Sequence, residues 1–169
     1  MTKEHKTKEH KAHVAIRNQL ARLAQAGDAR KGDIYAEIFT EDCLFQFGDD
    51  DNLRSMEGRE TIRQYINGRP IDMSTEEQAA ASKPKKPANP LGFISHHLTT
   101  SSIELVSDDE ADVRTYWFVI SPIGPDHSGF YTDRWHKVGD DWQLKHRRIR
   151  TVWRAENSYT RAKPAMEKA

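Results

Sequence analysis

Residues 111–121 read ADVRTYWFVIS, and this run decides the fold class. Successive residues of a β-strand point to opposite faces of a sheet, so Trp117 and Val119 share one face while Tyr116 and Phe118 share the other. Large side chains therefore stand on both faces of this strand. Because helices are expected to cover only one face, we expect the other to pack against a second copy of the chain, as a homodimer.

Three further runs of the same character lie on either side of this one. They occupy residues 94–106, 128–138 and 142–153, and they are rich in Thr, Val, Ile, Tyr and Trp. The segments that join the runs, such as Gly139-Asp140-Asp141, are rich in residues that form turns. The second half of the chain is therefore predicted to be an antiparallel meander of four strands.

The first half of the chain carries a helical pattern. Within residues 12–27, Ile16, Leu20 and Leu23 recur at the spacing of one helix face, and Gly27 follows where a helix commonly ends. The same half is predicted to contain a helix at 32–39, a strand at 43–47 and a helix at 59–67. Helices that precede a meander predict an α+β fold, with three N-terminal helices packed on one face of a mainly antiparallel sheet.

Three segments differ in composition from the predicted domain. Residues 1–11 are too polar to bury enough surface to offset their ordering entropy, which predicts a disordered polar tail or a solvated, frayed extension of the helix. Residues 69–93 contain four prolines and an alanine run, which predicts a long inserted loop that could gate a pocket. We assign one domain to residues 12–155, including this insert, and a C-terminal tail to residues 156–169.

The composition excludes several classes of protein. Lys and Arg together number 26, as do Asp and Glu, so no net charge attracts nucleic acid or an anionic membrane. No stretch approaches the ~20 apolar residues that span a bilayer, and the N-terminus lacks the apolar core of a secretory signal. Cys43 is the only cysteine, which favours a reducing compartment. We expect a cytoplasmic protein that binds neither nucleic acid nor a membrane.

Six short segments stand in the order of a known superfamily. They are Gly27-Asp28, IFTEDCLF at 38–45, GRETI at 58–62, HHLTT at 96–100, GFYTDR at 129–134 and WQLKHRRI at 142–149. Together they resemble the SnoaL-like branch of the nuclear-transport-factor-2-like superfamily, over residues 12–153 without the insert. This resemblance implies a cone-shaped α+β barrel, whose curved sheet surrounds a deep pocket.

The resemblance also implies an acid–base pair. Scytalone dehydratase, bile-acid 7α-dehydratase and hexachlorocyclohexane dehydrochlorinase belong to this superfamily, and they place an Asp from the end of the first helix against a His at the start of the first long strand. By position these residues correspond to Asp28 and His96. Only one of His96 and His97 can face the pocket without a bulge, and we assign His96. Thr100 stands where the family strand usually has Asn, which weakens one expected substrate contact.

Elementary chemistry agrees with this role for the pair. An Asp beside Nδ1 of a histidine holds the ring in one tautomer and stabilises the imidazolium, which leaves Nε2 to accept a proton from carbon. The alternative is structural: Asp28 would cap the second helix, and both histidines would pack against their neighbours. A general base of this kind needs no cofactor, and we expect none. We also expect no metal ion, since the acidic run from Asp49 has Arg54 where a calcium loop needs glycine.

Further polar residues are candidates for binding the substrate. Tyr131 and Asp133 share a strand face, and Asp133 is expected to pair with His146 or Arg148 of the neighbouring strand. A buried Arg148 would hold a substrate oxyanion or carboxylate, and the alternative is a structural ion pair that closes the cone. Tyr35 would hydrogen-bond a leaving hydroxyl or, alternatively, fill the core.

Together these assignments predict a cofactor-independent, dehydratase-like lyase or isomerase that acts on a small, mostly apolar, oxygenated cyclic compound. The pocket lining is expected to include Phe45, Leu98 and Trp117. Two alternatives remain open. The chain could be a non-catalytic ligand-binding or structural subunit, similar to dioxygenase β subunits, or a SnoaL-type cyclase that uses Asp133 as its acid–base residue.

Overall fold

The computed structural model describes residues 3–48, 50–68 and 93–160. Its elements are, in chain order, α1 (Lys3–Asp28), α2 (Gly32–Glu37), β1 (Phe39–Phe47), a short 3-10 helix (Asp50–Asn52), β2 (Arg54–Glu57), α3 (Arg59–Ile66), β3 (Ser95–Leu105), β4 (Glu110–Ser121), β5 (Gly124–Val138) and β6 (Asp141–Arg154). Helices precede the long strands, so the predicted α+β class is confirmed. Apart from Phe93, the predicted insert at 69–93 lies outside the described residues, as does the chain beyond residue 160.

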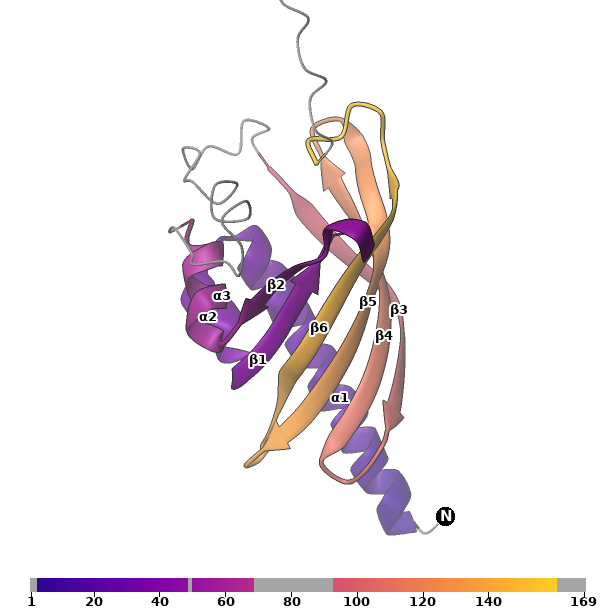
Figure 1. Cartoon of the computed structure of the whole chain (residues 1–169). Coiled ribbons are helices and arrows are strands. Elements are labelled where there is room, and N and C mark those ends of the chain that lie inside the picture. Colours follow the sequence, from indigo (N-terminus) through magenta and orange to yellow (C-terminus); the bar gives the residue numbers. More distant parts are fainter. Residues whose placement is uncertain (1–2, 49, 69–92, 161–169) are drawn as a thin grey trace, which may run out of the picture.

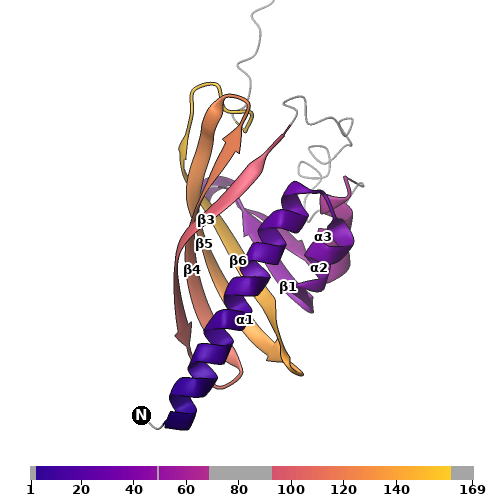
Figure 2. The ribbon, with the colours of Figure 1, turned by 180° about the vertical axis from the view of Figure 1, so that it is seen from behind.

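Six strands form one curved sheet, in the order β2-β1-β6-β5-β4-β3 (Figure 1). The four long strands form the predicted meander, and each pairs antiparallel with the next. The last of them, β6, returns beside β1 and pairs with it in parallel. Figure 2 shows α1 lying across one face of this sheet, where it contacts β3 and β6.

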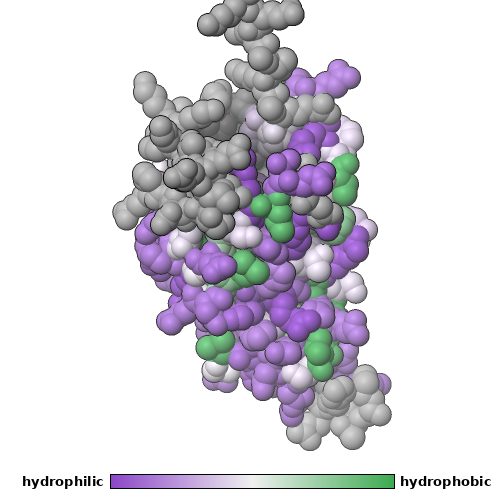
Figure 3. Space-filling model, viewed as in Figure 1, coloured by the Kyte–Doolittle hydropathy of each residue, from purple (hydrophilic) through white to green (hydrophobic). Residues whose placement is uncertain are grey.

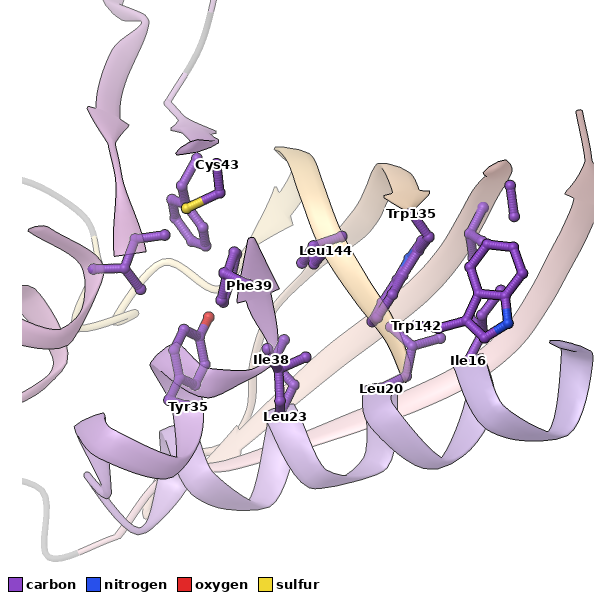
Figure 4. Packing of buried hydrophobic residues seen from close by; sticks show 14 of the residues in the cluster. Ile16, Leu20, Leu23, Tyr35, Ile38, Phe39, Cys43, Trp135, Trp142 and Leu144 are labelled. Carbon is purple, nitrogen blue, oxygen red and sulfur yellow. The ribbon is translucent and has the colours of Figure 1, made fainter. Parts of the chain in front are cut away.

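Helix α1 packs on the sheet through the apolar stripe that the sequence predicts. Ile16, Leu20 and Leu23 are all buried. Figure 4 shows them projecting from α1 into the same cluster as Trp142 and Leu144 of β6. Burying a leucine side chain contributes about 1.5–3 kcal/mol, so this stripe fixes the position of α1 and of the residue that ends it.

The same helix includes most of the polar N-terminal segment. α1 begins at Lys3, so residues 3–11 continue the helix, as the extension read from the sequence does, and do not form a separate disordered tail. Lys and Glu have high helix propensity, and Ala12 is buried against the core. In addition, Nζ of Lys8 lies 3.3 Å from the carboxylate of Asp108 in the β3–β4 turn. Helix propensity and the burial of Ala12 account for the helix in this polar segment, to which the exposed ion pair adds little.

Strand boundaries differ from the prediction at two places near the site. β1 begins at Phe39 rather than at residue 43, and it pairs with β2, a short strand that was not predicted. β5 begins at Gly124 rather than at residue 128, because the turn after β4 takes only two residues. This extension brings Asp126 and His127 into the sheet.

The outer face of the sheet has a mixed surface. Figure 3 shows this side as mostly hydrophilic, with apolar residues in separate spots. Tyr116 and Phe118 of β4 and Val152 and Trp153 of β6 are exposed. The homodimer through this face stays a prediction. None of the described helices is long and apolar enough to cross a bilayer.

Candidate active site

A cavity of about 660 Å³ lies between the helices and the curved sheet. Phe45, Leu98 and Trp117, the lining residues that the sequence predicts, all face it. Tyr131 stacks on Trp117 with ring centroids 5.5 Å apart. Gly129 makes room for this stack, since a Cβ there would lie 2.8 Å from the indole and 1.9 Å from a backbone carbonyl oxygen of β6. The result is an aromatic cavity of a size that suits a small organic ligand.

Asp28 and His96 meet at the wall of this cavity. Asp28 is the last residue of α1 and His96 the second residue of β3, and Figure 2 shows the end of α1 beside the start of β3. Nδ1 of His96 lies 2.5 Å from Oδ1 of Asp28, and the backbone N–H of His96 donates to Oδ2 over 2.8 Å. One carboxylate thus binds both the ring and the main chain of the same histidine.

This contact assigns the tautomer of His96. An ionised carboxylate only accepts hydrogen bonds, so Nδ1 carries the proton that points to Asp28. Nε2 has no hydrogen-bond partner among the described residues, and the ring lines the cavity. The lone pair of Nε2 is therefore able to accept a proton from a bound molecule.

Asp28 does not act as a cap of the second helix. The N-cap of α2 is Lys31, and no side chain caps the amides of that helix. Asp28 lies instead at the C-terminal end of α1, where the helix dipole disfavours a negative charge by about 0.3–1 kcal/mol. The two hydrogen bonds from His96 offset this cost. The helix-cap alternative is therefore wrong.

His97 lies on the other face of β3. Its ring stacks on Phe118 with 4.9 Å between centroids, and its Nε2 lies 3.2 Å from Oγ of Ser95. Neither His97 nor Thr100 belongs to the cavity lining among the described residues. Of the histidine doublet, the structure places only His96 at the cavity.

Asp133 forms a buried ion pair with Arg147. Arg147 donates from Nε to Oδ1 over 2.8 Å and from Nη2 to Oδ2 over 2.6 Å. The guanidinium carbon also lies 4.0 Å from the ring centroid of Tyr131. The Asp133 side chain is 0% exposed, and each of its oxygens accepts a hydrogen bond from Arg147. The cyclase alternative, which depends on Asp133, stays a prediction, and it would require Asp133 to leave this ion pair.

A β-bulge explains why the prediction paired Asp133 with His146 or Arg148. From the turn up to Trp135, the register of β5 and β6 would set Asp133 opposite His146 if it continued unbroken. A bulge just before Trp135 shifts the register by one residue and sets Asp133 opposite Arg147. The partner was missed because strand alternation by itself does not reveal a bulge.

Arg148 does not line the cavity formed by the described residues, which corrects its predicted role in substrate binding. Its Nη1 donates to the carbonyl oxygens of Gly48 and Ile149, each over 2.9 Å. It follows Arg147 in β6, so the alternation of the strand turns it to the other face. Arg148 thus ties β6 to the end of β1.

Tyr35 and Tyr131 both line the cavity, and both are largely buried. Burial raises the pKa of Tyr35 to about 12, although Arg147 acts in the opposite direction. Burial likewise raises the pKa of Tyr131. Both phenols therefore stay neutral at physiological pH, where each is able to donate a hydrogen bond.

A second Asp–His contact lies at the cavity and was not predicted from the sequence. His127 also lines it, and Nδ1 of His127 lies 2.9 Å from Oδ1 of Asp126. The predicted strand began at residue 128, which left both residues unassigned. An acid and an imidazole side by side ahead of a β-rich run were the signal that could have found them.

The SnoaL-like domain family model matches residues 8–148. No curated protein matches the chain. Among solved structures, the chain is similar to a protein of Novosphingobium aromaticivorans attributed to the scytalone dehydratases. The TM-score is 0.67 and the sequence identity is 22%, and the match covers 94% of this chain and 99% of that one. The hexachlorocyclohexane dehydrochlorinase LinA-type3 of Novosphingobium barchaimii has a TM-score of 0.65 at 14% identity, over 89% of this chain and 92% of that one.

A third similar structure is named for a different role. It is the β subunit attributed to an aromatic-ring-hydroxylating dioxygenase of Novosphingobium aromaticivorans, with a TM-score of 0.62 and 17% identity over 85% of this chain and 90% of that one. At such identities the likeness concerns the fold alone. It supports the cone-shaped α+β arrangement of helices on a curved sheet.

Proposed function

Since the chain belongs to the SnoaL-like domain family, we propose that it is a cofactor-independent lyase or isomerase in which His96 removes a proton from carbon. The observation that carries this proposal is the contact of the Asp28 carboxylate with Nδ1 and the backbone N–H of His96. The ring so held lines a cavity large enough for a small cyclic compound. An oriented imidazole beside such a cavity fits general-base chemistry.

In the proposed reaction, every proton and electron pair is transferred within the Asp28–His96 pair and the substrate. Nε2 of His96 takes the proton, and the imidazolium is stabilised by the Asp28 carboxylate at Nδ1. In a dehydration, the electron pair of the C–H bond forms a double bond to the neighbouring carbon, whose hydroxide leaves with the proton of Nε2 as water. In an isomerisation, the imidazolium returns the proton to a different carbon. Both routes regenerate neutral His96.

The lining supports an apolar, oxygenated cyclic substrate. The stacked rings of Trp117 and Tyr131 offer a flat apolar wall, and Phe45 adds to it. The neutral phenol of Tyr35 would donate a hydrogen bond to a carbonyl or to the leaving hydroxyl. Polar side chains such as Asn52, Arg147 and Thr151 also line the cavity, and polar groups beside an aromatic wall are typical of small-molecule sites.

A second candidate function is non-catalytic. The likeness to a β subunit attributed to a dioxygenase favours a structural or ligand-binding subunit. Such a protein would keep the cavity but would not need a proton acceptor in it. The two functions therefore differ in whether His96 is required.

Exchange of hydrogen for deuterium at carbon tests the proposal with a panel of model compounds. Cyclic ketones and cyclic β-hydroxy ketones are incubated with the protein in deuterium oxide and followed by NMR for exchange next to the carbonyl and for loss of water. We expect turnover of at least one compound by the wild type and its loss in His96→Gln. The control, His97→Gln, changes the neighbouring ring outside the cavity and should keep wild-type turnover. No turnover across the panel, or equal turnover in His96→Gln, contradicts the proposal.

A further inference from the structure

A second imidazole lies in the same cross-strand row as His96. His96 pairs with Val119 between β3 and β4, and Val119 pairs with His127 between β4 and β5. Adjacent strands lie about 4.8 Å apart, so the two histidine backbones are about 10 Å apart. The ring of Trp117 lies near both, with its centroid 6.5 Å from that of His96 and 5.4 Å from that of His127. One concave wall thus presents two histidines.

A β-bulge lets two adjacent residues of β5 face the interior. Val119 pairs with His127 and Ile120 pairs with Pro125, which leaves Asp126 as the extra residue. Both Asp126 and His127 are buried, although neighbours in a regular strand face opposite sides. The bulge therefore brings the carboxylate to the imidazole of the next residue.

The carboxylate of Asp126 is fully buried and is held by three donors. Oδ1 accepts hydrogen bonds from Nδ1 of His127 over 2.9 Å and from Oγ of Ser158 over 2.5 Å. Oδ2 accepts one from Oγ of Ser121 over 2.9 Å. Burial raises the pKa of Asp126, but the hydrogen bonds outweigh it and leave the pKa below its usual value. A charged carboxylate therefore stays in the interior and keeps the proton of His127 on Nδ1.

His127 is consequently a neutral hydrogen-bond acceptor. Burial lowers its pKa, although the hydrogen bond to Asp126 acts in the opposite direction. Nε2 has no hydrogen-bond partner among the described residues and is not closed off from the cavity that the ring lines. Tyr159, from the segment after β6, packs edge-on against this ring at 5.6 Å between centroids. Residues 156–160, expected in a C-terminal tail, thus complete the wall that holds His127.

We propose that His127 binds a hydroxyl group of the substrate, either a phenol or an alcohol. A neutral imidazole nitrogen with a lone pair accepts a hydrogen bond from O–H, and it offers nothing to a carbonyl or an ether oxygen. This inference rests on the proposed function for the role of His96, and it adds the substrate class. The substrate is a hydroxylated ring that presents a C–H bond to His96 and an O–H group to His127.

Two matched probes test this assignment on the full chain. 2-Naphthol carries an O–H group, and 2-methoxynaphthalene carries a methyl ether in its place. We expect the wild type to bind 2-naphthol about fivefold to tenfold more tightly, the ratio expected of one hydrogen bond, in NMR titrations. His127→Phe should abolish this preference, and His96→Gln should retain it. Equal binding of the probes by the wild type, or a preference that survives in His127→Phe, overturns the proposal.

His127→Phe removes a hydrogen-bond donor from the buried Asp126, and the variant could therefore fail to fold. A measurement on the wild type tests the inference without this variant. In ¹⁵N NMR of the histidine rings, 2-naphthol should shift the Nε2 resonance of His127, and 2-methoxynaphthalene should leave it unchanged. An unshifted His127 resonance with 2-naphthol overturns the inference. Deuterium exchange on ketones without a hydroxyl group reports on His96 alone, so failure of the proposed function gives a separate result.

Discussion

Asp28→Asn is the sharpest perturbation of the candidate site, because only a carboxylate can serve both contacts found there. Oδ1 accepts from Nδ1–H of His96, and Oδ2 accepts from the backbone N–H of the same residue. An amide side chain has one accepting oxygen and one donating NH₂ group. In this variant one of the two contacts must therefore change.

The size of the effect follows from the two orientations of the amide. If its oxygen faces Nδ1, the NH₂ group faces the backbone N–H, and an unpaired donor costs about 1–3 kcal/mol. That cost reduces the competent population by about 5-fold to 150-fold. If the NH₂ group faces Nδ1, the proton moves to Nε2 of His96, which can no longer accept one. The comparable change in a Ser–His–Asp triad costs about 10⁴-fold, which sets the upper end.

Deuterium exchange gives the rate of proton transfer, and ¹⁵N NMR of the His96 ring gives its tautomer. We expect exchange in Asp28→Asn to be slower by about 5-fold to 10⁴-fold, with the Nε2–H tautomer increased. Circular dichroism should show the same fold, because α1 is positioned by its apolar stripe. A variant with the wild-type rate and an unchanged Nδ1–H tautomer would refute the reasoning.

Three further predictions concern the buried polar groups. Asp133→Asn leaves the guanidinium of Arg147 buried without its counter-charge, so urea unfolding should show a free energy of unfolding lower by about 3–5 kcal/mol. The double variant Asp133→Leu with Arg147→Met should recover most of this loss. A double variant as unstable as Asp133→Asn would contradict this account. Ser158→Ala removes one donor from Asp126 and should lower the free energy of unfolding by about 1–3 kcal/mol, whereas no change would indicate a free tail there. Burial lowers the pKa of His127 in the folded state, so the unfolded chain binds more protons below about pH 6.5. The free energy of unfolding should therefore fall as the pH is lowered from about 7.5 to 5.5, and less steeply in His127→Phe.

The parts of the fold that depend on local pattern were predictable. Ile16, Leu20 and Leu23 mark the buried face of α1 because helical spacing repeats over several turns. The four strands of the meander were predicted within a few residues, except for the start of β5. Only tertiary contacts distinguish that start from a longer turn, because Pro125 also suits a turn.

The candidate site was predictable only in part, because β-bulges change which residues of neighbouring strands lie opposite one another. Asp28 and His96 are 68 positions apart and meet because α1 packs on β3, and the pair was assigned from the order of family motifs. Arg147 and His127 lie beside bulges, where alternation no longer tells which side chains face the interior. Bulges have no sequence signature here, so strand pairing had to be known before these residues could be placed.

The two Asp–His contacts suit different tasks because they differ in exposure. The side chains of His96 and Asp28 are 30% and 20% exposed, whereas those of His127 and Asp126 are 9% and 0% exposed. A general base that exchanges hydrogen for deuterium must trade its proton with solvent, and the partial exposure of His96 allows this. For His127, burial disfavours the charged ring and the buried carboxylate holds its orientation. These constraints suit a fixed hydrogen-bond acceptor, which is why we assign proton removal to His96 and hydroxyl binding to His127.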